Sequence, residues 1–567
     1  MNSTNGPVPV PGLSTLDAYD PGGTTCPTDL RLSGNEGRAP SRELLLKLTE
    51  AGVEGLRRYP DRRPLEVRLA DLNGLKPENV LVTAGADDAL DRICRTYLDS
   101  ARNLVVATPT FEMIPRYARL AGAEVREAAW RDELFPVTQV LDLVDAQTGV
   151  IAVVTPNNPT GTVATAADLV QLSDAAPQAL LLVDLAYGEF ADEDLMPTVL
   201  KLPNAVGVRS MSKAWGLAGL RVGYVAGPES LIAPLRAAGG PYAVSGPSLA
   251  VAQAALADQP AVESFVAEVR CERGLIQDCL TTLGAVPTAS QANFAYAEIN
   301  NAGWVQDGLA GLGIAIRHFG APDGPGHIRI SCPGDEQNCA RVTQSLKVVL
   351  APEALLFDMD GVLADVSGSY RQAILETVRS YGQEVTLADI AEAKRLPGSN
   401  NDWELTRSLL AARKIRVDLA AVTERFQEFY NKLSHTEKLL PTPALLRRLA
   451  AYVPLAIVTG RPRLEAEEFL ARTGSREFFT TMVCLEDGPE KPDPAPVRLA
   501  LERLGVERAW MFGDTVNDIL AARRAGVLPL GMVPPGESPD DYSLCLTAAG
   551  AGRVFTDLSA LQEVLPI

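Results

Sequence analysis

The chain has few of the residues that build metal clusters and disulfide frameworks. Its 567 residues include three histidines and eight cysteines, and no two cysteines form a C-x-x-C pair. Neither a zinc cluster nor a disulfide framework is therefore expected. No apolar run approaches the roughly 18 residues that a membrane helix needs, and the N-terminal MNSTNGPVPVPG lacks a basic region followed by an apolar stretch. These absences predict a cytoplasmic protein with reduced thiols.

The charge balance narrows the class of partner. The chain carries 71 acidic and 52 basic side chains, which gives a formal net charge of -19. A surplus of negative charge opposes non-specific attraction to nucleic acid or to an anionic membrane. We therefore expect small-molecule partners, with no nucleic acid and no membrane.

Apolar runs alternate with amphipathic segments along the chain. NVLVTAG, NLVVATP, GVIAVVTP, ALLLVDLA and AVGVRSM are short and strand-like, and the same rhythm restarts at ALLFDMD. This pattern is typical of parallel sheets covered by helices, so the predicted class is α/β with two successive units. Pro352 separates them, which predicts domains at 1–350 and 353–567. A charged, helical stretch at about 366–440 is expected to form a cap on the second domain.

Three charged residues mark a candidate site in the first unit. Asp184 ends the strand ALLLVD, Lys213 follows the strand AVGVRSM, and Arg221 lies eight positions further on. Loops at the carboxyl ends of parallel strands build binding sites. Pyridoxal 5′-phosphate (PLP) needs a lysine for its aldehyde, an anion opposite its pyridine nitrogen and a partner for its phosphate. The three residues therefore indicate a PLP site with Lys213 as the catalytic residue.

The motifs TPNNPTG, VDLAY and SMSKAWGLAGLRVGY resemble those of fold-type I PLP-dependent aminotransferases, which have a large and a small domain. The resemblance implies cofactor roles for a further set of residues. The phenolic oxygen would be bound by Asn158 and Tyr187, the phosphate by Ser210 with Arg221 and by the backbone of Ala86 and Asp87, and the ring face by Phe111.

Within that superfamily the chain is most similar to histidinol-phosphate aminotransferases, through AYDPGG, RYPD, PYAVS, SQANF and IRIS. The resemblance implies that Tyr59 reaches the cofactor phosphate of a neighbouring subunit, and hence a homodimer. It also implies that Arg329 grips the distal anion of the substrate, with Arg317 and Tyr19 beside it. The sequence departs from the family pattern in reading NEG for NENP, close to the substrate.

A second candidate site follows the strand ALLF. Asp358 and Asp360 in FDMDG are two positions apart, so their carboxylates project together from the loop beyond the strand. Two such close carboxylates repel unless a cation shares them. Magnesium, which prefers oxygen ligands, fits this need.

FDMDG, VTGRP, EKPDP and GDTVND, in that order, resemble the four motifs of the haloacid dehalogenase superfamily, which has a Rossmann-like fold. The resemblance implies that Asp358 is the nucleophile and Asp360 the general acid. Thr459 and Lys491 would bind phosphate, and Asp514 with Asp518 would form the acidic motif, so that the predicted Mg²⁺ ligands are Asp358, Asp360 and Asp514. An acid at position 360 favours a phosphatase over a dehalogenase.

Together the two resemblances predict a bifunctional enzyme of histidine biosynthesis. The first domain would transaminate imidazole acetol phosphate with glutamate, and the second would hydrolyse the resulting histidinol phosphate. Two alternatives stay open. The PLP domain could be a lyase or an aminotransferase for another amino-acid phosphate, or the second domain could be a module without catalysis.

Overall fold

The chain is described from a computed structural model. The structure describes residues 13, 17–18, 23–50, 52–131, 133–320, 326–394 and 401–567. Contacts divide it into two compact units. The first holds the described residues within 1–22, with Leu32–Glu298 and Arg329–Ala340, and the second holds Gly23–Arg31, Ile299–Ile328 and Arg341–Ile567. Among the described residues, no helix is both long enough and apolar enough to cross a bilayer.

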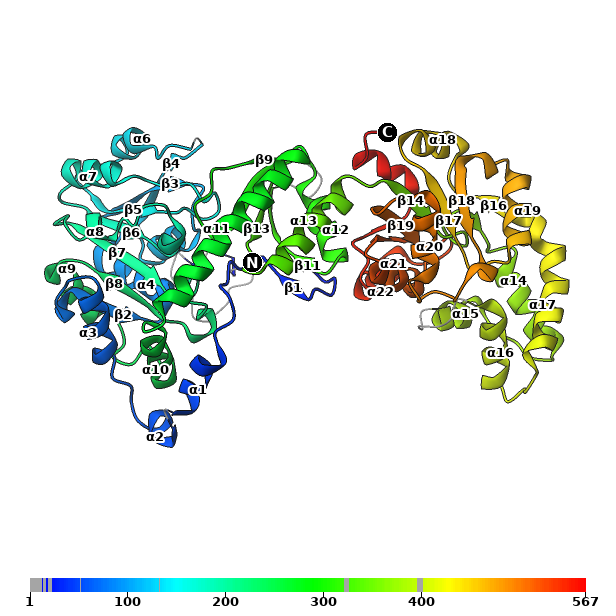
Figure 1. Cartoon of the computed structure of the whole chain (residues 1–567), viewed down its shortest axis with the longest axis horizontal. Coiled ribbons are helices and arrows are strands. Elements are labelled where there is room, and N and C mark those ends of the chain that lie inside the picture. The colour runs from blue at the N-terminus through cyan, green and yellow to red at the C-terminus, as the bar shows by residue number, and fades with distance from the viewer. Residues whose placement is uncertain are drawn as a thin grey trace, which may run out of the picture. The chain divides into compact units, whose positions relative to one another are not determined.

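Strands and helices alternate through the first part of the chain (Figure 1). The helices are α1 (Arg42–Glu50), α2 (Gly52–Arg57), α3 (Arg63–Leu72), α4 (Gly85–Tyr97), α5 (Met113–Leu120), α6 (Val137–Asp142), α7 (Ala166–Ala175), α8 (Met196–Val199), α9 (Glu229–Ala238), α10 (Gly246–Ala255) and α11 (Gln259–Thr282). The strands are β1 (Leu30–Arg31), β2 (Val80–Thr83), β3 (Asn103–Thr108), β4 (Glu124–Ala129), β5 (Thr148–Val154), β6 (Leu180–Asp184), β7 (Ala205–Ser210), β8 (Gly223–Ala226), β9 (Val286–Pro287) and β10 (Phe294–Ile299).

A seven-stranded sheet, in the order β2-β8-β7-β6-β5-β3-β4, organises the first unit. β8 runs antiparallel to β2 and β7, and β7, β6, β5, β3 and β4 are parallel to one another. Every residue of β5, β6 and β7 is buried. Such continuous apolar runs form strands that helices cover on both faces, and two separate buried clusters flank this sheet. The predicted α/β class is therefore confirmed for this unit.

The later elements include those of the second unit. The helices are α12 (Ala302–Gly311), α13 (Glu336–Leu350), α14 (Tyr370–Ser380), α15 (Leu387–Lys394), α16 (Asp402–Ala412), α17 (Leu419–Leu433), α18 (Pro443–Tyr452), α19 (Arg463–Thr473), α20 (Ala495–Leu504), α21 (Val516–Ala525) and α22 (Pro539–Ala549). The strands are β11 (Ile314–Ala315), β12 (Arg317–Gly320), β13 (Gly326–Ser331), β14 (Ala354–Phe357), β15 (Ala364–Asp365), β16 (Lys438–Leu439), β17 (Leu455–Val458), β18 (Phe479–Val483), β19 (Ala509–Gly513), β20 (Leu528–Met532) and β21 (Arg553–Phe555).

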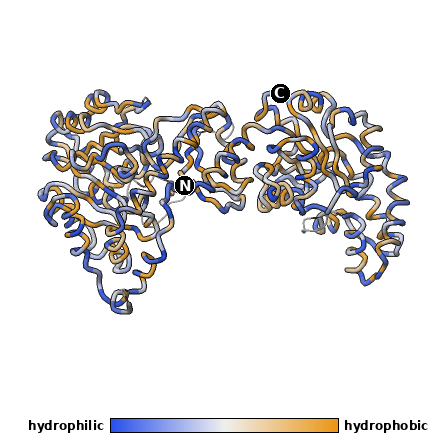
Figure 2. Tube along the Cα trace, in the orientation of Figure 1, coloured by the Kyte–Doolittle hydropathy of each residue, from blue (hydrophilic) through white to orange (hydrophobic). Residues whose placement is uncertain are grey.

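A six-stranded parallel sheet, in the order β18-β17-β14-β19-β20-β21, forms the centre of the second unit. Much of this region is orange in Figure 2, the colour of hydrophobic residues, and the strands are buried. Helices α14, α16 and α17 pack on one another and lie in the chain between β15 and β16. These two short strands pair antiparallel, so the helical segment leaves and rejoins the sheet at one place.

Helix α12 packs against β20 and β21 within the second unit. The ring of Trp304 lies 4.8 Å from that of Trp510, and Arg553 pairs with Asp307 at 2.8 Å. The indole of Trp304 donates to Val349 O, the carbonyl of a residue near the end of α13. Residues 302–311 therefore bury their aromatic side against the six-stranded sheet.

Candidate active sites

The residues predicted to hold PLP follow neighbouring strands of the seven-stranded sheet (Figure 1). Asn158 comes after β5, Asp184 ends β6, and Lys213 comes after β7. These three strands are adjacent and parallel, so their carboxyl ends meet at one edge. Arg221 lies just before β8, whose antiparallel course brings its start to the same edge.

Asp184 is a buried carboxyl beside the candidate lysine. It is 3 % exposed, and its Oδ1 accepts the N–H of Ala186 at 3.0 Å. Burial raises the pKa of Asp184 to about 7, although the nearby Lys213 ammonium and the Ala186 N–H oppose the rise. Lys213 Nζ donates to Gly34 O at 3.0 Å and lies 5.6 Å from the centre of the Tyr187 ring. The arrangement suits a cationic ring nitrogen at Asp184 and an aldehyde at Lys213.

Asn158 and Tyr187 are held by a hydrogen-bonded group of side chains. Asn35 donates to the Tyr187 hydroxyl at 3.0 Å and accepts from Ser331 Oγ at 2.8 Å. Arg329 donates to Asn158 Oδ1 and to the carbonyl of Ser33. Arg329 and Asn158 are therefore in contact. The partner of Tyr187 is Asn35, which lies in the NEG segment where the sequence departs from the family pattern.

The predicted phosphate-binding end lies at the start of α4. Ala86 and Asp87 form its first turn, where backbone N–H groups are available to an anion. Arg221 Nη2 binds Asp87 Oδ2 at 2.8 Å, and Arg221 Nη1 donates to Ser212 Oγ at 3.3 Å. Ser210 Oγ accepts from the backbone N–H of Ser212. Ser212, which precedes the lysine in SMSK, was not among the predicted residues.

Four predicted residues remain: Phe111, Tyr59, Arg317 and Tyr19. Phe111 is half-buried against the core cluster beside the sheet. Tyr59 is 80 % exposed and stacks on Tyr242, with the ring centres 4.3 Å apart. Arg317 lies on β12 in the second unit, over the ring of Phe319. Tyr19 lies outside the described residues.

These residues fit PLP on physical grounds. A carboxyl buried at Asp184 is costly to ionise alone and gains from a cationic partner. Gly85 opens α4 with φ +78, and a Cβ there would collide with the Arg221 guanidinium, so backbone and arginine converge on one point. An N-terminal helix turn and a guanidinium converging in this way form an anion seat.

The predicted phosphatase residues also follow adjacent strands. Asp358 comes after β14, Thr459 after β17, and Asp514 after β19, and β14 lies between the other two. Lys491 follows β18, the next strand in the sheet. Gly361, at φ +73, has no room for a Cβ beside the Asp514 carboxylate, so the loop after β14 passes directly over Asp514.

Lys491 is the buried cation of this site. Its Nζ binds Asp358 Oδ1 at 2.8 Å and Asp518 Oδ1 at 2.5 Å. Burial alone would lower the pKa of Lys491, but these two carboxylates hold it well above its usual range. Burial raises the pKa of Asp358, and the ammonium opposes the rise. The contact therefore favours the charged form of Lys491, whereas burial disfavours the charged form of Asp358.

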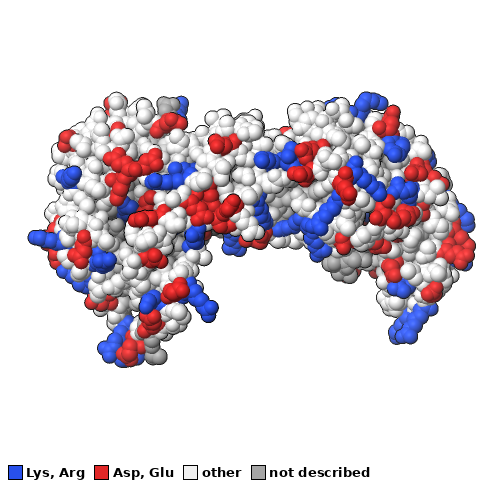
Figure 3. Space-filling model, in the orientation of Figure 1, with Lys and Arg blue, Asp and Glu red and all other residues white. Residues whose placement is uncertain are grey.

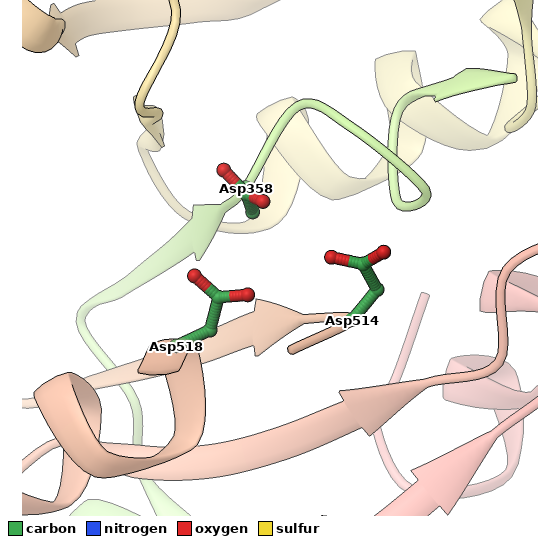
Figure 4. Close-up of side chains that lie close together, drawn as sticks. All are labelled: Asp358, Asp514 and Asp518. Atoms are coloured by element: carbon green, nitrogen blue, oxygen red, sulfur yellow. The ribbon is translucent and has the colours of Figure 1, made fainter. Parts of the chain in front are cut away.

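Three carboxylates gather at this point, as Figure 4 shows. Oxygen atoms of Asp358, Asp514 and Asp518 lie within 4.8 Å of one another, and all three residues are buried. Asp518 also accepts from Thr515 Oγ1 at 2.6 Å and caps α21. Three acids around the ammonium of Lys491 leave negative charge, which a hard divalent cation would offset. The donor set therefore fits Mg²⁺.

The Asp360 carboxylate points elsewhere. Its Oδ1 accepts from Arg461 Nε at 2.6 Å, and its side chain is 25 % exposed. A pocket of about 70 Å³, open in part to solvent, lies beside it. Asp358, Thr459, Lys491 and Trp403 of α16 are among the residues that line this pocket. On the faces seen in Figure 3, acidic and basic side chains are interspersed.

Comparison with known families identifies both parts of the chain. Residues 29–346 match the family described as aminotransferase class I and II, and residues 352–526 match the haloacid dehalogenase-like hydrolases. The chain therefore belongs to the aminotransferase class I and II family and carries a haloacid dehalogenase-like hydrolase domain after it. PLP is the cofactor of the first family. The two resemblances predicted from the motifs are confirmed.

Individual relatives give a more specific similarity for the aminotransferase part of the chain. Histidinol-phosphate aminotransferase of Dinoroseobacter shibae is 30% identical over 61% of this chain and 99% of its own, and that of Haloferax volcanii is 33% identical over 60% and 95%. A protein named imidazoleglycerol-phosphate dehydratase, from Phytophthora nicotianae, is 41% identical over 231 residues, which are 38% of this chain. The match spans half the length of that protein.

Solved structures show the same fold. Histidinol-phosphate aminotransferase of Sinorhizobium meliloti, in complex with PLP, aligns with a TM-score of 0.53 at 24% identity, over 60% of this chain and 97% of its own. A putative aminotransferase of Burkholderia pseudomallei aligns with a TM-score of 0.50 at 28% identity, over 56% and 98%. The predicted fold-type I architecture is thereby confirmed.

Proposed function

We propose that the chain catalyses two consecutive steps of histidine biosynthesis. The first site transfers an amino group between glutamate and imidazole acetol phosphate, and the second hydrolyses L-histidinol phosphate to histidinol. The observation that carries the proposal is that one chain holds both the residues expected of a PLP site and those expected of a phosphatase site. Relatives named histidinol-phosphate aminotransferase support the first step over nearly their whole length.

In the first site, PLP would supply an electron sink for the substrate amine carbon. Lys213 would hold the cofactor and carry the proton between carbon atoms through its Nζ. Asp184 would keep the ring nitrogen protonated, and Asn158 with Tyr187 would bind the phenolic oxygen. Arg329 would bind the substrate anion. Its guanidinium contacts Asn158, one of the residues that would bind the cofactor, and so lies beside the proposed cofactor site.

In the second site, Asp358 would attack phosphorus and form an aspartyl phosphate while the ester oxygen leaves. Asp360 would give that oxygen a proton and later take one from the attacking water. Thr459 and Lys491 would bind the phosphoryl oxygens. Mg²⁺, held by Asp358, Asp514 and the loop at Asp360, would offset the charge of the phosphoryl group.

We also propose the limits of the catalytic parts and their assembly. The aminotransferase domain would span 1–350 and the hydrolase domain 353–567, with the cap at about 366–440. The family matches at 29–346 and 352–526 and the helices between β15 and β16 support these limits, whereas contacts group Gly23–Arg31, Ile299–Ile328 and residues 341–350 with the hydrolase part. A homodimer is supported by exposed apolar side chains on and near α1 and α2. They are Leu45, Leu46, Leu56, Tyr59 and Tyr242. A biosynthetic role supports a cytoplasmic location.

A coupled assay tests the function. Purified protein with PLP, Mg²⁺, 2-oxoglutarate and histidinol phosphate should release glutamate and inorganic phosphate. Lys213→Ala should abolish only glutamate, and Asp358→Asn only phosphate, each variant serving as the control for the other. If the wild type released neither product, the proposal that histidinol phosphate is the substrate would be refuted. Unchanged phosphate release by Asp358→Asn would refute catalysis in the second site.

A further inference from the structure

Arg461 is a buried cation that the proposed chemistry does not use. It follows Thr459 and Gly460 in VTGRP, and its side chain is 1 % exposed. One side of its guanidinium contacts Asp360 Oδ1, from Nε at 2.6 Å and from Nη2 at 2.5 Å. The other side contacts both oxygens of Glu437, at 3.2 Å each. One guanidinium therefore joins the candidate general acid to a second carboxylate.

Glu437 lies where the cap meets the sheet. It immediately precedes β16, the strand by which the chain returns from the cap, and its side chain is fully buried. Ser369, just before α14 on the outgoing side of the cap, donates to Glu437 Oε1 at 2.8 Å. Both connections between cap and sheet therefore converge on the carboxylate that Arg461 binds.

Aromatic rings fix the guanidinium from the sides. The ring of Tyr370, the first residue of α14, lies 4.9 Å from Arg461 Cζ, and the ring of Phe469 lies at 5.5 Å. The Tyr370 hydroxyl in turn donates to Glu465 of α19. Cation–π contacts in such a desolvated place are at the strong end of their range. Arg461 consequently has little freedom to turn independently of the cap.

We propose that Arg461 is a positioning residue that sets the orientation of Asp360 from the position of the cap connections. A guanidinium is a planar fork that can bind two carboxylates in fixed directions, which a lysine ammonium does not do. When the ester P–O bond breaks, its electron pair stays on the leaving oxygen, which takes a proton from Asp360 Oδ2, since Arg461 contacts Oδ1. A displaced Asp360 would miss that oxygen. The inference rests on the proposed phosphatase function.

The dependence of rate on the leaving group tests it. The full-length enzyme is assayed with histidinol phosphate and with phenyl phosphates that carry different ring substituents, and kcat/KM is measured for each ester. A basic leaving group needs the proton of a general acid, which is typically worth about 10²- to 10⁴-fold. Arg461→Gln should lose about 10²-fold on histidinol phosphate. It should lose far less on 4-nitrophenyl phosphate, whose leaving group needs little protonation.

Three further variants separate positioning from folding. Arg461→Lys keeps the charge and should show the same leaving-group dependence, as should Glu437→Gln, which does not touch Asp360. Arg425→Gln is the matched control, because Arg425 is a half-exposed arginine of the cap helix α17 and pairs with Glu428. It should leave the dependence unchanged. Transamination by the same preparations confirms that the chain is folded.

The outcomes are distinct. An equal loss on all esters in both Arg461→Lys and Glu437→Gln would overturn the positioning role, because a merely structural defect does not depend on the leaving group. A wild type that hydrolyses none of the esters would refute the proposed phosphatase instead.

Discussion

Replacing Asp184 with asparagine is expected to stabilise the PLP-free protein at alkaline pH. The pKa of this buried carboxyl rises from 3.8 to about 7 in the folded chain. Because the folded state holds the proton more tightly than the unfolded state, the free energy of unfolding falls as the pH rises from about 4 to 7. Each pKa unit is worth about 1.4 kcal/mol, so the loss reaches at most about 4 kcal/mol above pH 7.

The asparagine side chain would remain neutral and could still accept the Ala186 N–H, so Asp184→Asn should not lose this stability. Urea unfolding of the PLP-free wild type and variant at pH 5 and pH 8 measures the difference. The variant should be more stable by up to about 4 kcal/mol at pH 8 and by much less at pH 5. Added PLP should reverse the order, because a cationic ring nitrogen stabilises the Asp184 carboxylate and gains nothing from asparagine. Equal unfolding curves at pH 8 would refute the claim that burial dominates at Asp184.

Three other perturbations have defined outcomes. EDTA should stop phosphate release and leave glutamate formation intact, with recovery on added Mg²⁺; release in metal-free buffer would contradict the metal site. Lys491→Met should abolish phosphate release and lower the free energy of unfolding of the second unit by about 3–5 kcal/mol, because it leaves Asp358 and Asp518 buried without their cation; an unchanged urea midpoint would argue against this. Leu56→Asp should shift a dimer to monomer in sedimentation experiments, whereas Leu544→Asp, on a similarly exposed leucine of α22, should not; a monomeric wild type would refute the dimer.

The location of the site residues at the ends of strands could be predicted from the sequence, because parallel strands place their carboxyl ends at one edge of a sheet. The sequence predicts that Asp184 ends a strand and that Lys213 and Asp358 each follow one. The structure adds that β6 lies beside β7 and β14 beside β19. The contact between Arg221 and Ser212 was not predicted, because the family resemblance implies Ser210 as the partner of Arg221 on the phosphate.

The contact between Arg461 and Glu437 was also beyond sequence reasoning. The two residues are 24 positions apart, and their meeting depends on how the cap connections pack over the sheet. Nor did the sequence indicate that residues 302–311 pack on β20 and β21, since this segment lies within the predicted first domain. Long-range packing of this kind is decided by side-chain shape and not by local periodicity.

The packing of α12 has a consequence for the two parts of the chain if they are separated. Trp304 lies in the stretch that matches the aminotransferases, and Trp510 lies in the stretch that matches the hydrolases. A gene split at Pro352 would leave each product with an uncovered indole and would separate Arg553 from Asp307. Both fragments would then be prone to aggregate. Loss of either part by truncation would therefore destabilise the part that remains.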